Sequence, residues 1–280
     1  MKRIARLFGF VIICLISLAV ALIAQPVLFF ASTRRRLRFM ALVGRTWARA
    51  LLRMMGIKVV ADGLLPEHDL NHYLLVSNHQ SYLDIIIIAS IFPTSFVAMQ
   101  EVRDWPLLGW LARLGGTVFV NREDTHSSVR CAYRASRLLR DQITMQVFPE
   151  SKTNDGTRIQ PFKALFFASA LRAQAPILPL TLNTRAINGQ TVDELNRDRV
   201  CWYGDMEFMP HFWDFLTVDS AEFSVVIHES IRPLRMQGAR SIAQAAEQKV
   251  ISGFDPNRVS VAPVVCTAAP AQSTTSNVKY

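Results

Sequence analysis

Cysteine is scarce in this 280-residue chain, and no two cysteines stand in a Cys-x-x-Cys pair. The four are widely spaced, at Cys14, Cys131, Cys201 and Cys266. This spacing argues against a zinc site and gives little support to a disulfide framework. His68, His72 and His79 lie near one another in the chain but lack companion ligands at metal-binding spacings, so we expect no metal site.

Two signatures of hydrolytic enzymes are also missing. No Gly-x-Ser-x-Gly motif occurs, which disfavours a serine lipase. Cys131 and Arg137 have the six-residue offset of a cysteine phosphatase loop, but no glycine lies between them and the segment has a helical pattern. The chain has no internal repeats, and we see no nucleic-acid recognition motif.

Acidic residues are fewer than basic ones. The chain has 22 Asp and Glu against 31 Lys and Arg, a formal net charge of +9, and half of its residues are hydrophobic. The surplus favours an anionic partner, such as a phosphate-bearing substrate or an anionic lipid surface; nucleic acid ranks low. The length allows one large domain or two small ones, with a sizeable core.

The segment from Leu7 to Ala31 contains no charged residue. The part before Pro26 would form a helix about 29 Å long, at ~1.5 Å per residue, which is enough to cross a hydrocarbon layer of about 30 Å. A cleaved signal peptide, with a cleavage site at residues 19–21, is the alternative. We favour a transmembrane or membrane-inserted anchor over residues 7–31, because the apolar run continues past that site and an arginine cluster follows. Basic residues flank both ends, so the orientation stays open.

The rest of the chain alternates between helical and extended patterns. We predict helices over 39–55, from near 81, and over 106–114, 127–142, 163–174 and 240–252. We predict strands over 57–60, 73–77, 96–98, 117–120, 145–148, 177–181 and 223–228. This alternation indicates an α/β layer architecture over residues 39–254. Residues 255–280 have no periodic pattern, and we expect a disordered tail.

Two predicted helices carry arginines on one face. In the first, arginine recurs at every fourth position, at Arg45, Arg49 and Arg53. In the helix over 127–142 the spacings are four, three and three, at Arg130, Arg134, Arg137 and Arg140. For this second face we favour simple solvation over contact with anionic headgroups or cofactor phosphates.

Residues 78–84 (NHQSYLD) place a histidine at the end of one apolar run and an aspartate at the start of the next. Imidazole titrates near neutrality and a carboxylate can hold its tautomer, so His79 with Asp84 is a candidate general base. The two can meet only if His79 lies in the loop and Asp84 in the first turn of the following helix. The alternative is a capping box from Ser81 to Asp84, in which the acid only accepts hydrogen bonds from backbone N–H groups.

Three further segments have informative residues in or just after predicted strands. Residues 116–122 (GTVFVNR) put Arg122 just past a strand, where a guanidinium can clamp a phosphate. Residues 148–151 (FPES) end another strand with a proline and Glu150, and a polar loop follows. Pro179 lies inside an apolar strand, where its missing N–H suits an edge or a bulge.

In this order and spacing, the four segments resemble the motif blocks of the glycerolipid acyltransferase family, which includes the 1-acylglycerol-3-phosphate acyltransferases. The family's blocks are Asn-His followed by four residues and Asp, a Gly-rich strand ending in Phe-x-x-Arg, Phe-Pro-Glu-Gly, and a hydrophobic-Pro-hydrophobic strand. Ser151 stands here in place of the glycine of the third block. The resemblance covers roughly residues 76–182. It implies a single acyltransferase domain with a central mixed sheet flanked by helices.

The resemblance also implies roles for individual residues. His79 is the base that deprotonates the acceptor hydroxyl, which then attacks an acyl thioester, and Asp84 orients it. The residues predicted to bind substrate are Asn78, Arg122, Glu150, Ser151, Lys152 and Lys163. The cosubstrate is acyl-CoA or acyl carrier protein (acyl-ACP), and no metal or tightly bound cofactor is implied.

The resemblance predicts an enzyme at the cytoplasmic membrane, with its catalytic domain facing the cytoplasm, that acylates the sn-2 hydroxyl of lysophosphatidic acid to give phosphatidic acid. One departure leaves the acceptor open, because the family often has an arginine where Thr153 stands. Either Lys152, Arg158 or Lys163 meets the phosphate, or the acceptor is another lysolipid such as a lyso-ornithine lipid. A non-catalytic membrane protein that binds lipid is the alternative from another class, although the retained His–Asp pair argues against it.

Overall fold

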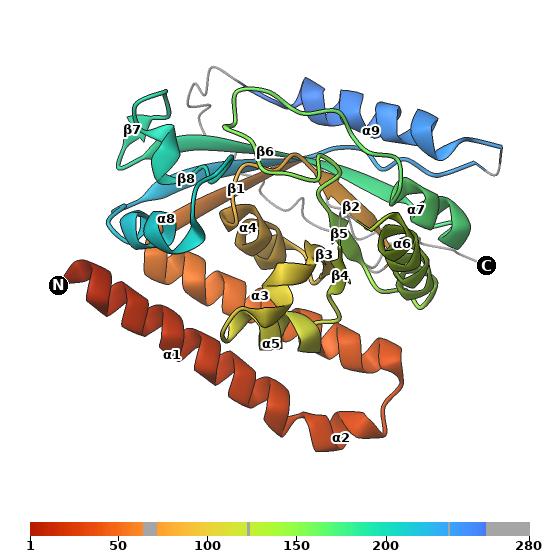
Figure 1. Ribbon diagram of the computed structural model, residues 1–280, viewed down its shortest axis with the longest axis horizontal. Helices are drawn as coiled ribbons and strands as arrows, with labels where there is room; N and C mark the ends of the chain where they lie inside the picture. The colour runs from red at the N-terminus through yellow and green to blue at the C-terminus, as the bar shows by residue number, and fades with distance from the viewer. Residues whose placement is uncertain (64–71, 122–123, 235, 256–280) are drawn as a thin grey trace, which may run out of the picture.

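The computed structural model describes residues 1–63, 72–121, 124–234 and 236–255 (Figure 1). The α-helices are α1 (Lys2–Ile23), α2 (Gln25–Phe29), α3 (Thr33–Met55), α4 (Leu83–Ile91), α5 (Leu108–Leu114), α6 (Thr125–Arg140), α7 (Phe167–Ala173), α8 (Phe208–Phe215) and α9 (Ala239–Ser252). The strands are β1 (Ile57–Gly63), β2 (Leu74–Ser77), β3 (Ser95–Met99), β4 (Val118–Val120), β5 (Met145–Val147), β6 (Ile177–Ile187), β7 (Gln190–Thr191) and β8 (Ala221–Ile227). Two short 3-10 helices are η1 (Gln100–Asp104) and η2 (Arg197–Arg199).

The α/β architecture predicted from the sequence is confirmed, although α8 was not predicted and two predicted helices need corrected bounds. The predicted helix over 39–55 is the C-terminal part of α3, which begins earlier because the Ser32 hydroxyl accepts a hydrogen bond from the Arg35 N–H (3.4 Å) and caps it. The predicted helix over 163–174 was too long. The Lys163 N–H donates to the Pro149 carbonyl (3.0 Å), so the residues before α7 follow a loop instead.

Gly56 ends α3, as the sequence indicated. Its φ of +73° lies in the left-handed region, which L side chains rarely adopt. A Cβ at this position would lie 2.5 Å from the carbonyl oxygen of Asp219. Only glycine therefore allows α3 to turn directly into β1 at this point.

The strands follow one another across the sheet in the order β1-β8-β6-β2-β5-β3-β4, and β7 pairs with β6. β8 runs antiparallel to β6, while the other pairs along this path are parallel, so the sheet is mixed as predicted. β2 lies between β6 and β5 near the middle of the sheet (Figure 1). Because β2 and β5 are parallel, the loops that follow them leave the sheet at the same edge, which is where α/β proteins form their sites.

Helices cover both faces of the sheet (Figure 1). On one face, Ile87 of α4 and Phe215 of α8 belong to the same buried cluster as Leu75 of β2. On the other face, Leu139 of α6 belongs to a second buried cluster that includes Leu74 of β2. Successive residues of β2 thus point into opposite cores, as the two-residue period of a strand requires.

Pro179 lies in β6, a central strand, so of the two predicted settings, an edge or a bulge, the edge is excluded. Ile177 pairs with Ile231 and Leu180 with Ile227, so three steps along β6 lie opposite four along the neighbouring chain. The Ile177 N–H donates to the Ile231 carbonyl (2.9 Å), and strand alternation points the nitrogen of Pro179 to the same side. The missing N–H therefore falls at an irregularity of the ladder, which is the bulge-like position that a proline requires.

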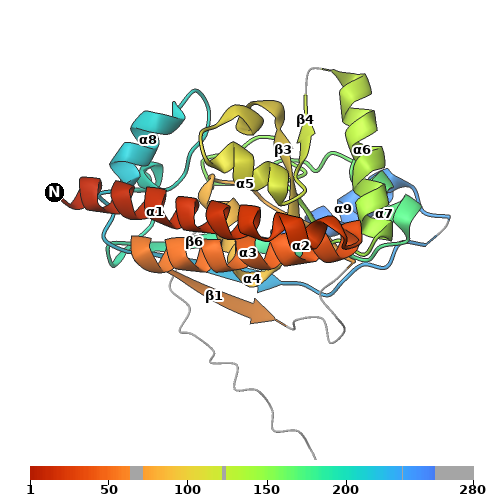
Figure 2. The same ribbon diagram turned by 90° about the horizontal axis from the view of Figure 1, so that it is seen from below.

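α1 runs alongside α3 in the opposite direction (Figures 1 and 2). The Trp47 indole N–H donates to the Cys14 sulfur (3.4 Å), and the Phe10 ring packs on Phe212 with centroids 5.1 Å apart. The Arg6 guanidinium donates to four backbone carbonyls of the globular part, those of Met55, Leu216, Val218 and Asp219. By length and composition, α1 is the one helix of the described residues that could cross a membrane.

The predicted tail, 255–280, lies outside the described residues except for Asp255. The Asp255 carboxylate forms an ion pair with Arg185 (2.6 Å), and its N–H donates to the Asn183 side chain (3.1 Å). The folded part of the chain therefore includes this residue.

Candidate active site

His79 leaves the sheet at the carboxyl end of β2. Asn78, just before it, is buried, and its side-chain amide donates to the Leu182 carbonyl (2.9 Å) and accepts from the Leu182 N–H (2.8 Å). These two bonds tie the end of β2 to β6 beyond the last backbone pair, Ser77 with Leu180. Asn78 therefore fixes the backbone from which His79 projects, and its predicted contact with substrate stays a prediction.

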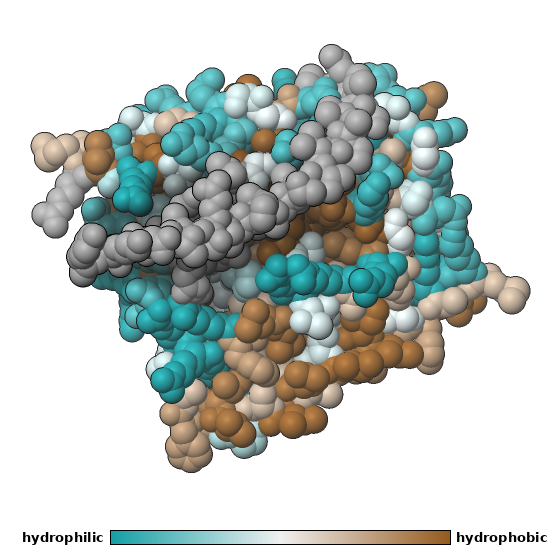
Figure 3. All heavy atoms as spheres, turned by 180° about the vertical axis from the view of Figure 1, so that it is seen from behind, coloured by the Kyte–Doolittle hydropathy of each residue, from teal (hydrophilic) through white to brown (hydrophobic). Residues whose placement is uncertain are grey.

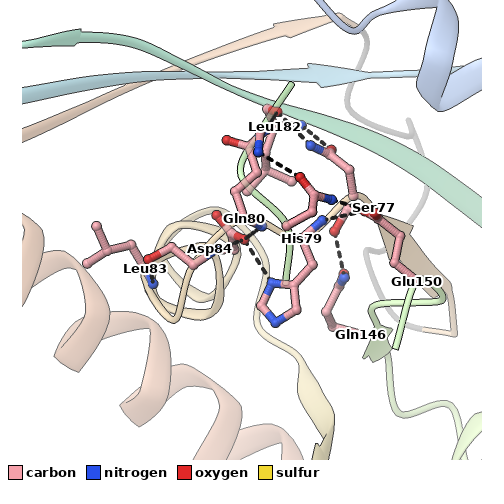
Figure 4. A network of polar contacts seen from close by, with 12 residues as sticks. Ser77, His79, Gln80, Leu83, Asp84, Gln146, Glu150 and Leu182 are labelled. Carbon is pink, nitrogen blue, oxygen red and sulfur yellow. Dashed lines mark hydrogen bonds and ion pairs between the residues drawn. The ribbon is translucent and has the colours of Figure 1, made fainter. Parts of the chain in front are cut away.

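The side chains of His79 and Asp84 meet (Figure 4). His79 Nδ1 lies 2.8 Å from Asp84 Oδ2, and that same oxygen accepts from the backbone N–H groups of Gln80 (2.6 Å) and Ser81 (2.9 Å). Asp84 thus orients the imidazole and also accepts two backbone N–H groups of the loop before α4, so the acid does more than the capping alternative supposed. With the Nδ1 proton directed at the carboxylate, Nε2 is the nitrogen that can accept a proton.

The imidazole is held flat against an aromatic ring. The rings of His79 and Phe148 are stacked, with centroids 3.7 Å apart and planes 12° from parallel. Phe148 begins a tight turn in which the Ser151 N–H donates to the Phe148 carbonyl (3.0 Å). Ser151 has a φ of +68°, so the glycine usual at this place in the motif has a structural reason.

Glu150 is buried and does not line the cavity; it contacts the backbone of His79 instead. Its carboxylate accepts from the His79 N–H (2.7 Å), the Asn154 side-chain amide (2.6 Å) and the Gln160 N–H (2.8 Å). Burial raises the pKa of Glu150 to about 7, although these three hydrogen bonds act in the opposite direction. The structure shows Glu150 holding the backbone around His79; the binding role implied by the motif stays a prediction.

A cavity of about 700 Å³ opens beside His79. Most of its lining is apolar and comes from α1, α3, α4, α5 and α8, with residues such as Phe10, Leu51, Ile86, Leu111 and Phe212. Its polar residues include Ser151, Lys152, Thr153 and Lys163 from the loop after β5, and Asp205 from the segment before α8. The arrangement places one candidate base between a long apolar space and a cationic rim.

The predicted Arg122 lies outside the described residues. The strand that leads to it does reach the site, because Thr117 and Val120 line the cavity. The predicted positions Ser151, Lys152 and Lys163 line it as well, whereas Asn78 and Glu150 support it from behind. Among the described residues, no group of three or more His, Cys, Asp or Glu side chains could hold a metal ion.

One pair of residues at this cavity was missed by the sequence analysis. Tyr82, in the first motif, donates from its hydroxyl to His211 Nδ1 (3.0 Å), while His211 Nε2 donates to the carbonyls of Cys201 and Asp198. Burial lowers the pKa of His211 and raises that of the Tyr82 hydroxyl. These contacts of His211 fix α8 against the motif. The two residues are 129 positions apart, so no local pattern could have paired them.

Comparisons with known proteins agree with this geometry. A family model described as Acyltransferase matches residues 57–183. The chain is 31% identical over 209 residues to the lyso-ornithine lipid O-acyltransferase of Brucella abortus, covering 72% of this chain and 78% of that protein. It is 35% identical over 134 residues to the 1-acyl-sn-glycerol-3-phosphate acyltransferase of Neisseria meningitidis, covering 48% of this chain and 52% of that protein.

The fold has a relative among solved structures. The crystal structure of the 1-acyl-sn-glycerophosphate (LPA) acyltransferase PlsC from Thermotoga maritima superposes with a TM-score of 0.68 at 19% identity, over 94% of this chain and all of that one. These matches favour an enzyme over the non-catalytic lipid-binding protein that the sequence left open. The chain belongs to the glycerolipid acyltransferase family and is an acyltransferase of the lysophospholipid type.

Proposed function

We propose that the enzyme transfers a fatty acyl group from a thioester to the hydroxyl of a lysolipid, with His79 as the general base. The observation that carries this proposal is the hydrogen-bonded pair of His79 and Asp84 at the wall of a large, mostly apolar cavity. An alcohol is a poor nucleophile until its proton is removed, and a positioned base contributes typically 10²- to 10⁴-fold to such a step.

The reaction balances with these groups alone. His79 Nε2 takes the proton of the acceptor hydroxyl as its oxygen attacks the thioester carbonyl. The negative charge of Asp84 stabilises the imidazolium that forms. The tetrahedral intermediate then expels the thiolate, which takes the proton back from the imidazolium, and the ester is released. The donor is acyl-CoA or acyl-ACP, and the scheme needs no metal and no tightly bound cofactor.

The cavity and α1 together support a place at the membrane interface. Phe10 and Ser17 of α1 line the cavity, and Arg6 is bonded to the globular part, so α1 is a wall of the site. Its outer side is apolar and exposed, with Ile4, Phe8, Ile12, Leu15 and Ile16, and a brown band over α1 and α2 is visible in the lower part of Figure 3. We propose that α1 lies in one leaflet with this side facing the acyl chains, rather than crossing the bilayer. Because thioester donors are made in the cytosol, we place the catalytic domain at the cytoplasmic face of the membrane.

One candidate acceptor is lysophosphatidic acid, acylated at its sn-2 hydroxyl to give phosphatidic acid. Lys152 and Lys163 line the cavity and supply positive charge for its phosphate. The relative from Neisseria meningitidis carries the corresponding name.

The second candidate is a lyso-ornithine lipid. Thr153 lines the cavity where the family often has an arginine, so a strong phosphate clamp is missing at this place. The relatives named lyso-ornithine lipid O-acyltransferase, from Brucella abortus and Rhizobium meliloti, also match over 72% and 74% of this chain.

Replacing His79 tests the chemistry. We expect His79→Ala to lower kcat by about 10²- to 10⁴-fold with either lysolipid and labelled acyl-CoA or acyl-ACP as donor. His126→Ala removes an exposed histidine of α6 that does not line the cavity, and should leave kcat unchanged. Turnover by the His79 variant at the wild-type rate would exclude this mechanism.

Binding to lipid vesicles tests the membrane placement. Ile12→Asp and Ile16→Asp put charges on the apolar side of α1, and we expect both to lower co-sedimentation with anionic vesicles strongly. Leu195→Asp changes a leucine that is more exposed than either isoleucine but far from α1 in the chain, and this variant should bind as the wild type does. Equal binding by all three variants would contradict a membrane contact through α1.

A further inference from the structure

Two loops, one after β5 and one before α8, are hydrogen-bonded to the backbone at His79 and Gln80. The loop after β5 is attached through the Asn154 N–H, which donates to the His79 carbonyl (3.0 Å). The segment before α8 is attached to the next residue, because the Trp202 N–H donates to the Gln80 carbonyl (2.9 Å). An ion pair between Arg197 and Asp155 (3.4 Å) joins the two segments. Both loops are therefore held at the catalytic histidine.

The second loop presents one acidic side chain to the cavity. The Met206 N–H donates to the Tyr203 carbonyl (3.3 Å), so Gly204 and Asp205 form the middle of a tight turn, with Gly204 at a φ of +61°. The Trp202 indole N–H donates to the Met206 carbonyl (2.8 Å) and closes the turn from the other side. Asp205 lines the cavity and lies three residues after Trp202, so its Cα is within about 11 Å of the nitrogen bonded to Gln80.

Three charged side chains line the cavity and are exposed, so they lie at its mouth, where it opens to solvent: Asp205, Lys152 and Lys163. Within the described residues, the Asp205 carboxylate makes no hydrogen bond or ion pair, whereas its neighbours Asp198 and Asp214 bond Tyr203 and Arg3. The side chains of Lys152 and Lys163 on the first loop likewise have no partner among the described residues, and both line the same cavity. The mouth therefore offers one negative and two positive charges to a ligand.

We propose that this mouth selects an acceptor with a zwitterionic headgroup, in which Lys152 and Lys163 meet the anionic group and Asp205 meets an ammonium. This inference rests on the proposed acyl transfer and deepens it, because it names amine-bearing lysolipids as the substrate class. Lysophosphatidic acid has no cation to offer, and its phosphate is repelled by the Asp205 carboxylate. An amino-acid lipid such as lyso-ornithine lipid matches both signs of charge.

The variant Asp205→Asn tests this selection, because it keeps the size of the side chain and removes its charge. Turnover is measured with lyso-ornithine lipid and with lysophosphatidic acid of the same acyl chain, each with one acyl donor. We expect the ratio of kcat/KM for the aminolipid over that for lysophosphatidic acid to fall roughly tenfold, mainly through KM, as the loss of a partly exposed charged hydrogen bond would cause. Lyso-ornithine lipid with an acetylated amine should lose the wild-type preference and be insensitive to the substitution.

Glu207→Gln is the matched control, since this acid lies two residues further on, is exposed and does not line the cavity. It should leave the ratio within about twofold, because the effect is local rather than a change in overall charge. An Asp205→Asn variant with the wild-type ratio, a Glu207→Gln variant with the same shift, or a wild-type enzyme inactive on the amine-bearing lipid would each overturn the inference. The proposed chemistry fails separately, if His79→Ala keeps its turnover.

Discussion

Two substitutions of Asp84 separate the effect of its negative charge from the effect of the hydrogen bonds that it accepts. One oxygen, Oδ2, accepts from His79 Nδ1 (2.8 Å) and from the backbone N–H groups of Gln80 (2.6 Å) and Ser81 (2.9 Å). In Asp84→Asn, the amide oxygen must occupy this place, because an NH₂ group there would face two fixed backbone donors. The imidazole then keeps both its tautomer and its orientation, and only the negative charge is lost.

We therefore expect a moderate effect from the amide. A hydrogen bond to a charged group is worth roughly 1.5–3 kcal/mol, against about 1 kcal/mol for a neutral one. The difference of about 0.5–2 kcal/mol corresponds to a loss of about 2- to 30-fold in kcat. The free energy of unfolding should fall by a similar amount.

Asp84→Ala removes the acceptor altogether. The side chain of Asp84 is only 2% exposed, so its removal leaves two backbone N–H groups buried without a partner, at a cost of roughly 1–3 kcal/mol each. The imidazole also loses the bond that fixes its tautomer, and we expect kcat to fall by about 10³-fold or more, toward the effect of removing the base.

The measurement is kcat with saturating acyl donor, together with chemical denaturation of each variant. Asp141→Asn serves as the control, because this aspartate is exposed at the end of α6. The order of activity should be wild type, Asp84→Asn, then Asp84→Ala. An alanine variant at least as active as the asparagine variant would refute the assignment of Asp84 as the residue that orients His79.

Three further predictions concern stability. Burial raises the pKa of Glu150 to about 7 in the folded state, above its usual 4.5, so between these pH values the folded protein binds more protons than the unfolded chain. Stability should therefore fall as pH rises from about 4.5 to about 7. Glu150→Gln should remove this slope in denaturation curves, and an unchanged slope would contradict it. Arg6→Ala should lower the free energy of unfolding by roughly 1–2 kcal/mol and expose the start of α3 to trypsin. The control is Arg53→Ala, which changes an exposed arginine of α3 and should have neither effect. Ser151→Gly should raise the free energy of unfolding by about 0.5–1 kcal/mol, because Ser151 has a φ of +68°, and a decrease would show that its side chain stabilises the turn.

Local patterns in the sequence were enough for most of the secondary structure. Alternating apolar runs and breaks predicted the strands, and Gly56 marked the end of α3 because one residue decides the left-handed conformation there. The pairing of His79 with Asp84 was also accessible, since five residues across a strand-to-helix junction can adopt few arrangements that bring a histidine to an acid. Helix starts were predicted less well, because the cap at Ser32 and the loop before Phe167 depend on single hydrogen bonds.

Contacts between distant parts of the chain required the tertiary structure. Glu150 and His79 are 71 residues apart, so no local pattern showed that the Glu150 carboxylate holds the backbone of His79. The central place of Pro179 depends on β6 lying between β2 and β8 in the sheet, which no local pattern encodes. Lys152 and Asp205 line one cavity because their separate loops bond to neighbouring carbonyls, at His79 and Gln80. The sequence by itself indicated His79 as the candidate base, because its partner Asp84 is local; only the folded chain decided what surrounds that histidine.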